Sequence, residues 1–316
     1  MELDIQSSKV LKGALSILIV LHHLQYGVEV PYFNIFKHVG APAVSIFFFL
    51  SGYGLMSSYI QKGIIYLNGF WRKRIWHIVN PFLIVTFLYL LMNYFDQNSF
   101  NSGMLTDLIF EGITPLPYSW FVFTIVVFYT FFYCVFRSAN LDINWKIICL
   151  LLLTVIYILT IKNILDYDRA WWVSVLGFPM GIIYKFYQKA LTGILTGIYR
   201  KISGIIALSV LCVCLILTKN EWLYIFVYAF IPVITILLFN CVEMPKPRFI
   251  SFLGNISYEI YLFHGVWIVL LRGNHIFIIS NILYVLAVFS LTIVTSYLLN
   301  ISLNKKKSLH ENTSSR

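Results

Sequence analysis

Long apolar stretches separated by short polar segments recur along almost the whole chain. A helix rises about 1.5 Å per residue, so roughly 20 apolar residues cross the apolar layer of a bilayer. Stretches of about this length lie at residues 9–26, 40–60, 75–95, 118–137, 145–162, 170–187, 202–218, 221–240, 254–271 and 276–300. The pattern therefore predicts an all-α polytopic membrane helix bundle with about ten transmembrane helices.

Two places in this pattern are unusual. Gly177, Pro179 and Gly181 interrupt the sixth stretch. A helix broken there would need neighbouring helices to cover its free backbone groups. The seventh and eighth stretches are joined only by Lys219 and Asn220, which predicts a tight helical hairpin.

The composition is that of a membrane protein. Of the 316 residues, 59% are hydrophobic and 11% are charged, which excludes an ordinary soluble protein. The first stretch lacks a small-residue cleavage site and is followed by further spans, so we expect no cleaved signal peptide. The cysteines fall in or beside apolar stretches and predict buried thiols, without a disulfide framework or a metal site. They are Cys134, Cys149, Cys212, Cys214 and Cys241.

The net charge of +10 is explained by membrane insertion. With the N-terminus in the cytoplasm, most Lys and Arg residues fall on the inner side, as the positive-inside rule requires. Both termini are then cytoplasmic, and the anionic inner leaflet, not nucleic acid, is the expected partner of this charge. The basic residues left outside are Lys37, Lys162, Arg169, Lys219 and Arg272.

A single domain is expected. Residues 1–303 form the transmembrane domain, and residues 304–316 form a polar, disordered cytoplasmic tail. The sequence contains no internal repeat and no appended soluble domain. Because the loops are short, any site must be built between helices.

The first stretch carries two adjacent histidines, His22 and His23, at a depth where ionisable side chains are costly and mark candidate sites. At about 100° per residue, Lys12 and His23 share one stripe with Ser16 and Ile19, roughly 16 Å apart along the axis. A histidine bonded to a neighbouring helix as a packing contact is the alternative. Lys12 on the same stripe favours a site in which the His23 imidazole takes a proton from a hydroxyl.

The ninth stretch carries a second polar stripe. Ser257, Tyr261 and His264 are spaced four and three residues apart, so they share one face of a helix. Glu259 lies on another face, where pairing with a basic loop residue would explain it. We therefore expect this polar stripe to face the polar stripe of the first helix.

The densest basic cluster outside the tail comprises Arg72, Lys73, Arg74 and His77. It is suited to binding phosphates. A plain topology signal, or binding to inner-leaflet headgroups, would explain it equally well.

Two further features have simpler explanations. Trp120 begins the fourth stretch, where an aromatic membrane anchor belongs. Ser51, Gly54 and Ser58 lie near one face of the second stretch. They predict close helix packing and not a catalytic serine.

With these residues described, the chain resembles the acyltransferase 3 family of integral-membrane O-acyltransferases, often O-acetyltransferases of bacterial surface glycans. The resemblance spans residues 9–300 and lies in the ordered set of blocks, since each block alone is weak. The blocks are Leu11-Lys12-Gly13 through His23, Phe47 to Tyr53, Lys73-Arg74 with Pro81, Trp120-Phe121 with Tyr129, and Ile256 to His264.

The resemblance implies a cytoplasmic acyl-coenzyme A donor, most often acetyl-CoA, and a hydroxyl acceptor on a cell-surface or lipid-linked glycan, in a bacterial plasma membrane. It implies no metal and no nucleic-acid partner. His23 is then the catalytic base, or a transient acyl carrier, and Lys12 faces the donor. Donor-binding candidates are Arg72, Lys73, Arg74 and His77; substrate-binding candidates are Ser257, Tyr261, His264 and Trp120.

The chain departs from the family at two positions. Lys12 stands where Arg is usual, which loses bidentate geometry, and His77 stands where a second basic residue is often found. A proton-coupled transporter or flippase is the rival interpretation. It would also contain intramembrane histidines and a broken helix, but the chain has no matching pair of broken segments. A membrane sensor would require an extramembrane module that the sequence lacks.

Overall fold

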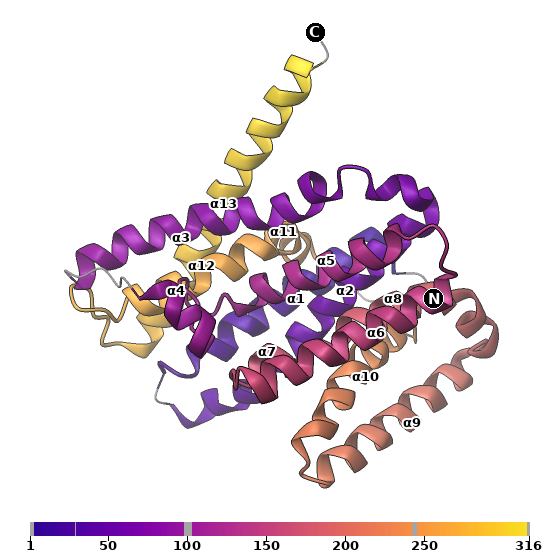
Figure 1. The fold of residues 1–316 in the computed structure, drawn as a ribbon. Coiled ribbons are helices and arrows are strands. Elements are labelled where there is room, and N and C mark those ends of the chain that lie inside the picture. Colours follow the sequence, from indigo (N-terminus) through magenta and orange to yellow (C-terminus); the bar gives the residue numbers. More distant parts are fainter. Residues whose placement is uncertain (1–2, 29, 98–102, 242–244, 315–316) are drawn as a thin grey trace.

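The computed structural model describes residues 3–28, 30–97, 103–241 and 245–314. Within these ranges the chain is helical, and its only β pairing is an isolated bridge between Arg272 and Phe277. The predicted all-α bundle is therefore confirmed. Helices α1 and α2 run through its middle, and α9 lies at one edge (Figure 1).

The helices follow the predicted stretches closely. The α-helices are α1 (Ile5–Leu24), α2 (Gly40–Lys62), α3 (Trp76–Gln97), α4 (Met104–Thr106), α5 (Trp120–Arg137), α6 (Ile143–Leu159), α7 (Ala170–Val173), α8 (Gly177–Ile194), α9 (Ile198–Leu217), α10 (Glu221–Cys241), α11 (Arg248–Asn255), α12 (Ser257–Leu270) and α13 (Asn281–Ser314). Short 3-10 or π turns are η1 (Pro31–His38), η2 (Gly63–Leu67), η3 (Trp71–Ile75), η4 (Asp107–Glu111) and η5 (Thr160–Ile164).

Eight helices among the described residues are long and apolar enough to cross a membrane. They contain α1, α2, α3, α5, α6, α9, α10 and α13. The two other predicted spans are divided, one into α7 and α8 and the other into α11 and α12. The 14 residues of α12 reach only about 21 Å at the usual helical rise. The ten crossings and the sides of the termini stay predictions.

The glycines of the sixth stretch serve a contact between α2 and α8. The helix breaks before Gly177, and Gly181 lies against the backbone of α2. A Cβ atom built on Gly181 would lie 2.1 Å from the Phe49 carbonyl oxygen, and one on Gly52 would lie 2.1 Å from the Phe178 carbonyl oxygen. Small residues on both helices therefore allow their backbones to touch.

Helix α1 is held against α11 in the same way. A Cβ atom on Gly13 would lie 2.0 Å from the Ile250 carbonyl oxygen, and one on Gly254 would lie 1.9 Å from the Lys9 carbonyl oxygen. Helix α1 also packs on α2 and α12. These contacts fix the rotation of α1, and with it the direction in which its polar stripe points.

A core of aromatic rings fills the space between α2, α5 and α8. Phe48, Phe128, Phe132 and Phe178 are fully buried. The ring centroids of Phe128 and Phe178 are 5.3 Å apart, within the range for favourable aromatic pairs. In lipid, such packing supplies much of the attraction between helices.

The structure differs from one expectation and leaves another untested. Helix α13 extends to Ser314 (Figure 1), and the division at residue 304 into a membrane domain and a disordered tail stays a prediction. No Gly or Pro occurs in α13 to end it. All five cysteines are free, which agrees with the expected lack of disulfides, but burial is wrong for Cys134 and Cys214. Both are exposed because they lie on helix faces turned away from the bundle.

Candidate active site

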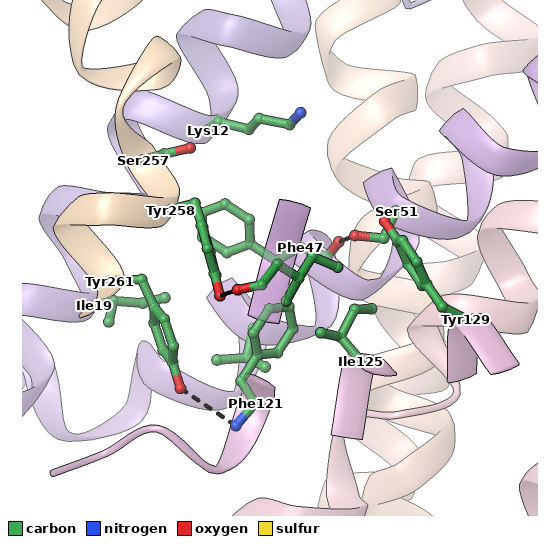
Figure 2. Close-up of a pocket in the computed structure, with 12 residues that line it drawn as sticks. Lys12, Ile19, Phe47, Ser51, Phe121, Ile125, Tyr129, Ser257, Tyr258 and Tyr261 are labelled. Carbon is green, nitrogen blue, oxygen red and sulfur yellow. Dashed lines mark hydrogen bonds between the residues drawn. The ribbon is translucent and has the colours of Figure 1, made fainter. Parts of the chain in front are cut away.

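A cavity lies between α1, α2, α3, α5 and α12, and we call it the Lys12 cavity (Figure 2). Its volume is about 730 Å³, counting the space at its open mouth. Most of the lining is apolar, with a few hydroxyl groups, as is usual for a small-molecule site. The lining residues are Lys12, Ile19, Val44, Phe47, Ser51, Ile78, Phe121, Ile125, Tyr129, Ser257, Tyr258 and Tyr261.

Lys12 is the one charged residue among the described residues that line this cavity. In Figure 2 it lies with Ser257 at one end of the cavity, while Tyr261 and Phe121 lie at the other. No ion pair or hydrogen bond joins its ammonium group to another described residue. Since an unpaired cation at membrane depth is costly, the cavity is suited to an anionic group.

The basic cluster lies next in sequence to a residue of the Lys12 cavity. The guanidinium of Arg74 stacks over the Tyr66 ring at 5.3 Å. Ile78, directly after His77, lines the cavity, and its carbonyl accepts a hydrogen bond from Tyr258 at 2.6 Å. The four basic side chains, Arg72, Lys73, Arg74 and His77, are exposed and line no part of the cavity itself.

A second cavity lies further along α1, toward its C-terminal end, and we call it the His23 cavity. Its volume is about 1010 Å³, again counting its open mouth. Its lining residues are Ile19, His22, His23, Tyr26, Lys37, His38, Gly40, Ala41, Val44, Trp120, Arg169, Ala170, Val173, Ser174, Tyr228 and Tyr261.

The two cavities meet at a wall made of three residues. Ile19, Val44 and Tyr261 line both cavities. Helix α1 therefore places Lys12 in one cavity and His23 in the other, with Ile19 between them. Ser16, the remaining member of the predicted stripe, lines neither cavity and donates a hydrogen bond to its own helix.

His23 lies among aromatic rings and carries no carboxylate partner among the described residues. Its ring stacks on Tyr118 with centroids 4.0 Å apart, and the His264 ring is 5.1 Å away. His264 Nδ1 lies 2.6 Å from the Tyr261 carbonyl oxygen, which can only accept. In the neutral ring Nδ1 is therefore the donor and Nε2 carries the lone pair. His264 Nε2 and His23 Nδ1 are buried without a hydrogen-bond partner among the described residues.

Comparison with known protein families matches residues 5–301 to the acyltransferase 3 family, described as an acyltransferase domain. The match covers nearly the whole chain. The chain belongs to the acyltransferase 3 family. No curated protein and no solved structure matched it. Membership supports membrane acyltransferase activity and implies an acyl donor and a sugar-type acceptor in general terms.

This acyltransferase brings the two predicted polar stripes together. Ser257 lines the Lys12 cavity, Tyr261 lies at the wall, and His264 packs behind His23. The three side chains of α12 thus lie alongside α1 in the same order. Ser257 lies near Lys12, Tyr261 lines both cavities with Ile19, and His264 packs against His23. The Tyr261 hydroxyl accepts a hydrogen bond from the Phe121 backbone at 3.3 Å, which fixes it at the wall (Figure 2).

Trp120 lines the His23 cavity and packs 6.2 Å from the Trp171 ring. It is therefore a cavity residue, where the sequence favoured a simple membrane anchor. Glu259 accepts a hydrogen bond from Asn300 at 2.8 Å and not from a basic loop residue. No group of His, Cys, Asp or Glu suited to a metal ion occurs in the part of the chain that the structure describes.

Several residues at or beside the cavities of this acyltransferase were missed in the sequence. Tyr118, whose ring stacks on His23, has a φ of 61°, an unusual backbone conformation for a non-glycine residue, and no sequence pattern marks it. Lys37 and Arg169 line the His23 cavity. The sequence could have indicated them, because basic residues are uncommon on the side predicted to be outside, and Lys37 and Arg169 are two of the few found there.

Proposed function

We propose that this acyltransferase transfers an acyl group, specifically acetyl, from cytoplasmic acetyl-CoA to a hydroxyl of a cell-surface or lipid-linked glycan in a bacterial plasma membrane. One observation carries the proposal. The cavity that holds an unpaired Lys12 meets the cavity that holds His23 at Ile19, Val44 and Tyr261. Two substrates can thus approach a shared wall from opposite ends of α1.

The donor enters from the Lys12 side in this proposal. Its phosphates bind to the exposed basic cluster, where Arg side chains supply paired donors and His77 supplies a further one. The arm of the coenzyme then lies along the apolar cavity, and Lys12 faces the thioester end. Ser257 lies near Lys12 in the same cavity and contacts the donor in this arrangement.

The acceptor enters from the His23 side. Trp120 offers an aromatic face to a sugar ring, and Tyr261 is fixed at the wall by its bond to Phe121. His264 contacts His23 and lines neither cavity, so its role is to position the base.

The chemistry needs one proton carrier. The His23 imidazole takes the proton from the acceptor hydroxyl, and the oxygen attacks the thioester carbonyl. The carbon–sulfur bond breaks, an ester bond forms, and the departing thiolate takes the proton back from His23. An acyl group carried briefly by His23 is the alternative. We favour the base, because a hydroxyl acceptor must lose its proton in either scheme.

The test reconstitutes the full chain in vesicles with radiolabelled acetyl-CoA and a crude surface-glycan acceptor. A positioned base contributes about 10²- to 10⁴-fold to rate, so His23→Ala should lose activity by that factor. The matched control is His275→Ala. It removes an imidazole that lines neither cavity and bonds the Phe95 carbonyl at 2.9 Å.

Three outcomes are informative. Loss in His23→Ala with activity kept in His275→Ala supports the assignment. Full transfer by His23→Ala removes His23 from catalysis. Absence of transfer by the wild-type protein, together with movement of the glycan across the vesicle membrane, would favour a carrier.

A further inference from the structure

Two cations lie at the His23 cavity, on segments far apart in the sequence. Lys37 is near the end of η1, and Arg169 directly precedes α7. Both are exposed residues that line the same cavity as His23. The sequence predicts both on the outer face, where basic residues are disfavoured, so their presence in one cavity calls for a reason.

No described carboxylate forms an ion pair with either cation. No Asp or Glu is among the described residues that line the His23 cavity. Among the described residues, Lys37 and Arg169 make no ion pair; Arg169 instead stacks over the Tyr224 ring at 4.8 Å. This stacking orients the guanidinium and leaves its N–H groups available to a ligand.

Lys162, another basic residue predicted on the outer face, shows the contrast. Its ammonium lies 4.2 Å from the Trp172 ring centroid and 4.1 Å from that of Trp222. It also pairs with Glu221 at 3.5 Å. Lys162 therefore serves as a contact between elements of the bundle, whereas Lys37 and Arg169 have no carboxylate partner among the described residues.

We propose that the acceptor of this enzyme is an anionic glycan, whose carboxylate or phosphate is bound by Lys37 and Arg169 at the mouth of the His23 cavity. The inference rests on the proposed function and adds the substrate class. A negative group held there leaves the sugar ring free to reach Trp120 and a hydroxyl free to reach His23. His38, which lines the same cavity, adds a ring N–H that can donate to an anionic oxygen.

Binding is measured first, with no acyl donor, by equilibrium dialysis of the full chain in detergent. The probes are a labelled glucuronate oligosaccharide, its carboxyl-reduced neutral counterpart, and a glycerol phosphate oligomer. The glucuronate oligosaccharide carries carboxylates, and the glycerol phosphate oligomer carries phosphates. We expect at least one of them to bind roughly tenfold or more tightly than the neutral probe, as charge-assisted hydrogen bonds give. Added salt should weaken that binding.

The variants Lys37→Gln and Arg169→Gln should each weaken binding of the preferred anionic probe about tenfold and leave the neutral probe unchanged. Both side chains are exposed, so neither variant threatens the fold. Lys219→Gln is the matched control. It removes one charge on the same predicted face but lines no part of the cavity.

The binding results separate this inference from the proposed function. If the neutral probe binds as well as both anionic probes, or if Lys219→Gln weakens anion binding as much as Arg169→Gln, the inference is wrong even where acetyl transfer occurs. If an anionic probe is preferred through Lys37 and Arg169 while no acetyl transfer is found with any acceptor, the anion site stands and the transfer reaction is what fails.

Discussion

Among the described residues, His23 has no acidic partner of the kind that orients a catalytic histidine in many hydrolases and transferases. The carboxylate on α12, Glu259, is bonded to Asn300. The rings of Tyr118 and His264 pack against His23 instead. In a low-dielectric site, packed aromatic rings can hold an imidazole in place without adding a charge that the membrane would penalise.

A pair of substitutions at His264 tests this role. Asn places its amide near the position of Nδ1 and can keep the bond to the Tyr261 carbonyl, but it loses the Nε2 lone pair. Gln reaches the position of Nε2. We expect His264→Asn to lower kcat about tenfold to a hundredfold with the KM for the proposed donor, acetyl-CoA, unchanged, and His264→Gln to retain more of the activity. Steady-state kinetics measure both, and equal kcat values for the two variants would show that His264 serves packing alone.

The sequence predicted part of this arrangement. Helical spacing placed Ser257, Tyr261 and His264 on one face and Lys12 with His23 on another, and the structure brings these faces together. Spacing within a helix cannot indicate what a loop contributes. Tyr118, whose ring stacks on His23, comes from a loop residue with positive φ and was therefore missed.

At the scale of helices, the sequence correctly predicted that small residues of α2 allow close helix packing, but the predicted packing face was wrong. It favoured Ser51, Gly54 and Ser58, yet Gly52 makes the close contact with α8 and Ser51 lines the Lys12 cavity. Inside a membrane every face of a helix is apolar, so the hydrophobic pattern does not indicate which face meets a neighbour.

Gly52 and Gly54 form a matched pair on that helix. A Cβ atom at Gly52 would lie 2.1 Å from the Phe178 carbonyl oxygen, whereas none of the surroundings lies within 4 Å of one at Gly54. Gly52→Ala should therefore push α8 away and lower the stability by about 1–3 kcal/mol. Gly54→Ala should be neutral or stabilising by up to about 1 kcal/mol. Thermal unfolding in detergent measures both; equal effects would contradict the packing described for α2 and α8.

An ion pair ties the start of α1 to the segment before α11. Lys246 Nζ lies 2.8 Å from Asp4 Oδ2, and the Ser7 backbone donates to the same carboxyl at 2.7 Å. The hydrogen bond from Lys246, followed by those from Ser7, holds the pKa of Asp4 well below its usual range. A carboxyl with a lowered pKa stabilises the fold above its unfolded pKa of about 3.9, and this contribution is lost as the pH falls toward the folded pKa.

Asp4→Asn removes this charge and keeps an acceptable helix cap. Because both partners are exposed, the variant should lose less than about 1 kcal/mol near neutral pH. The difference from wild type should stay constant from about pH 5 to about pH 8, and it should shrink below about pH 4 and in high salt. Thermal unfolding against pH measures it. A difference that grows in acid would mean that the Asp4 pKa is not lowered.

For the molecule as a whole, the sequence predicted the class and the course of the helices but could not show the cavities. Eight of the predicted spans are long helices among the described residues. Of the two divided spans, α11 with α12 carries Tyr261 and His264, and α7 with α8 includes Ala170 and Val173, which line the His23 cavity. Helices broken at membrane depth are tolerated where protein covers them, and here they border the site.

Cysteine labelling decides whether the divided segments cross the membrane. In a variant with its five native cysteines replaced by Ser, single cysteines are introduced as Asn140→Cys, Asn220→Cys and Ser308→Cys. If α8 and α12 both cross, an odd number of spans separates Asn220 from each of the other two positions. An impermeant maleimide should then label position 220 on intact cells, and positions 140 and 308 only after permeabilisation, as the positive-inside rule requires.

Labelling of positions 220 and 308 from the same side would mean that α12, at 14 residues, does not cross. The same result for positions 140 and 220 would mean that α8 does not cross. The parent variant must first show the same acyl transfer as the wild-type protein, so that labelling reports the active fold. If all three positions label as expected, the basic cluster faces the cytoplasm while Lys37 and Arg169 face outward. A donor and an anionic acceptor would then meet at Tyr261 from opposite sides of the membrane.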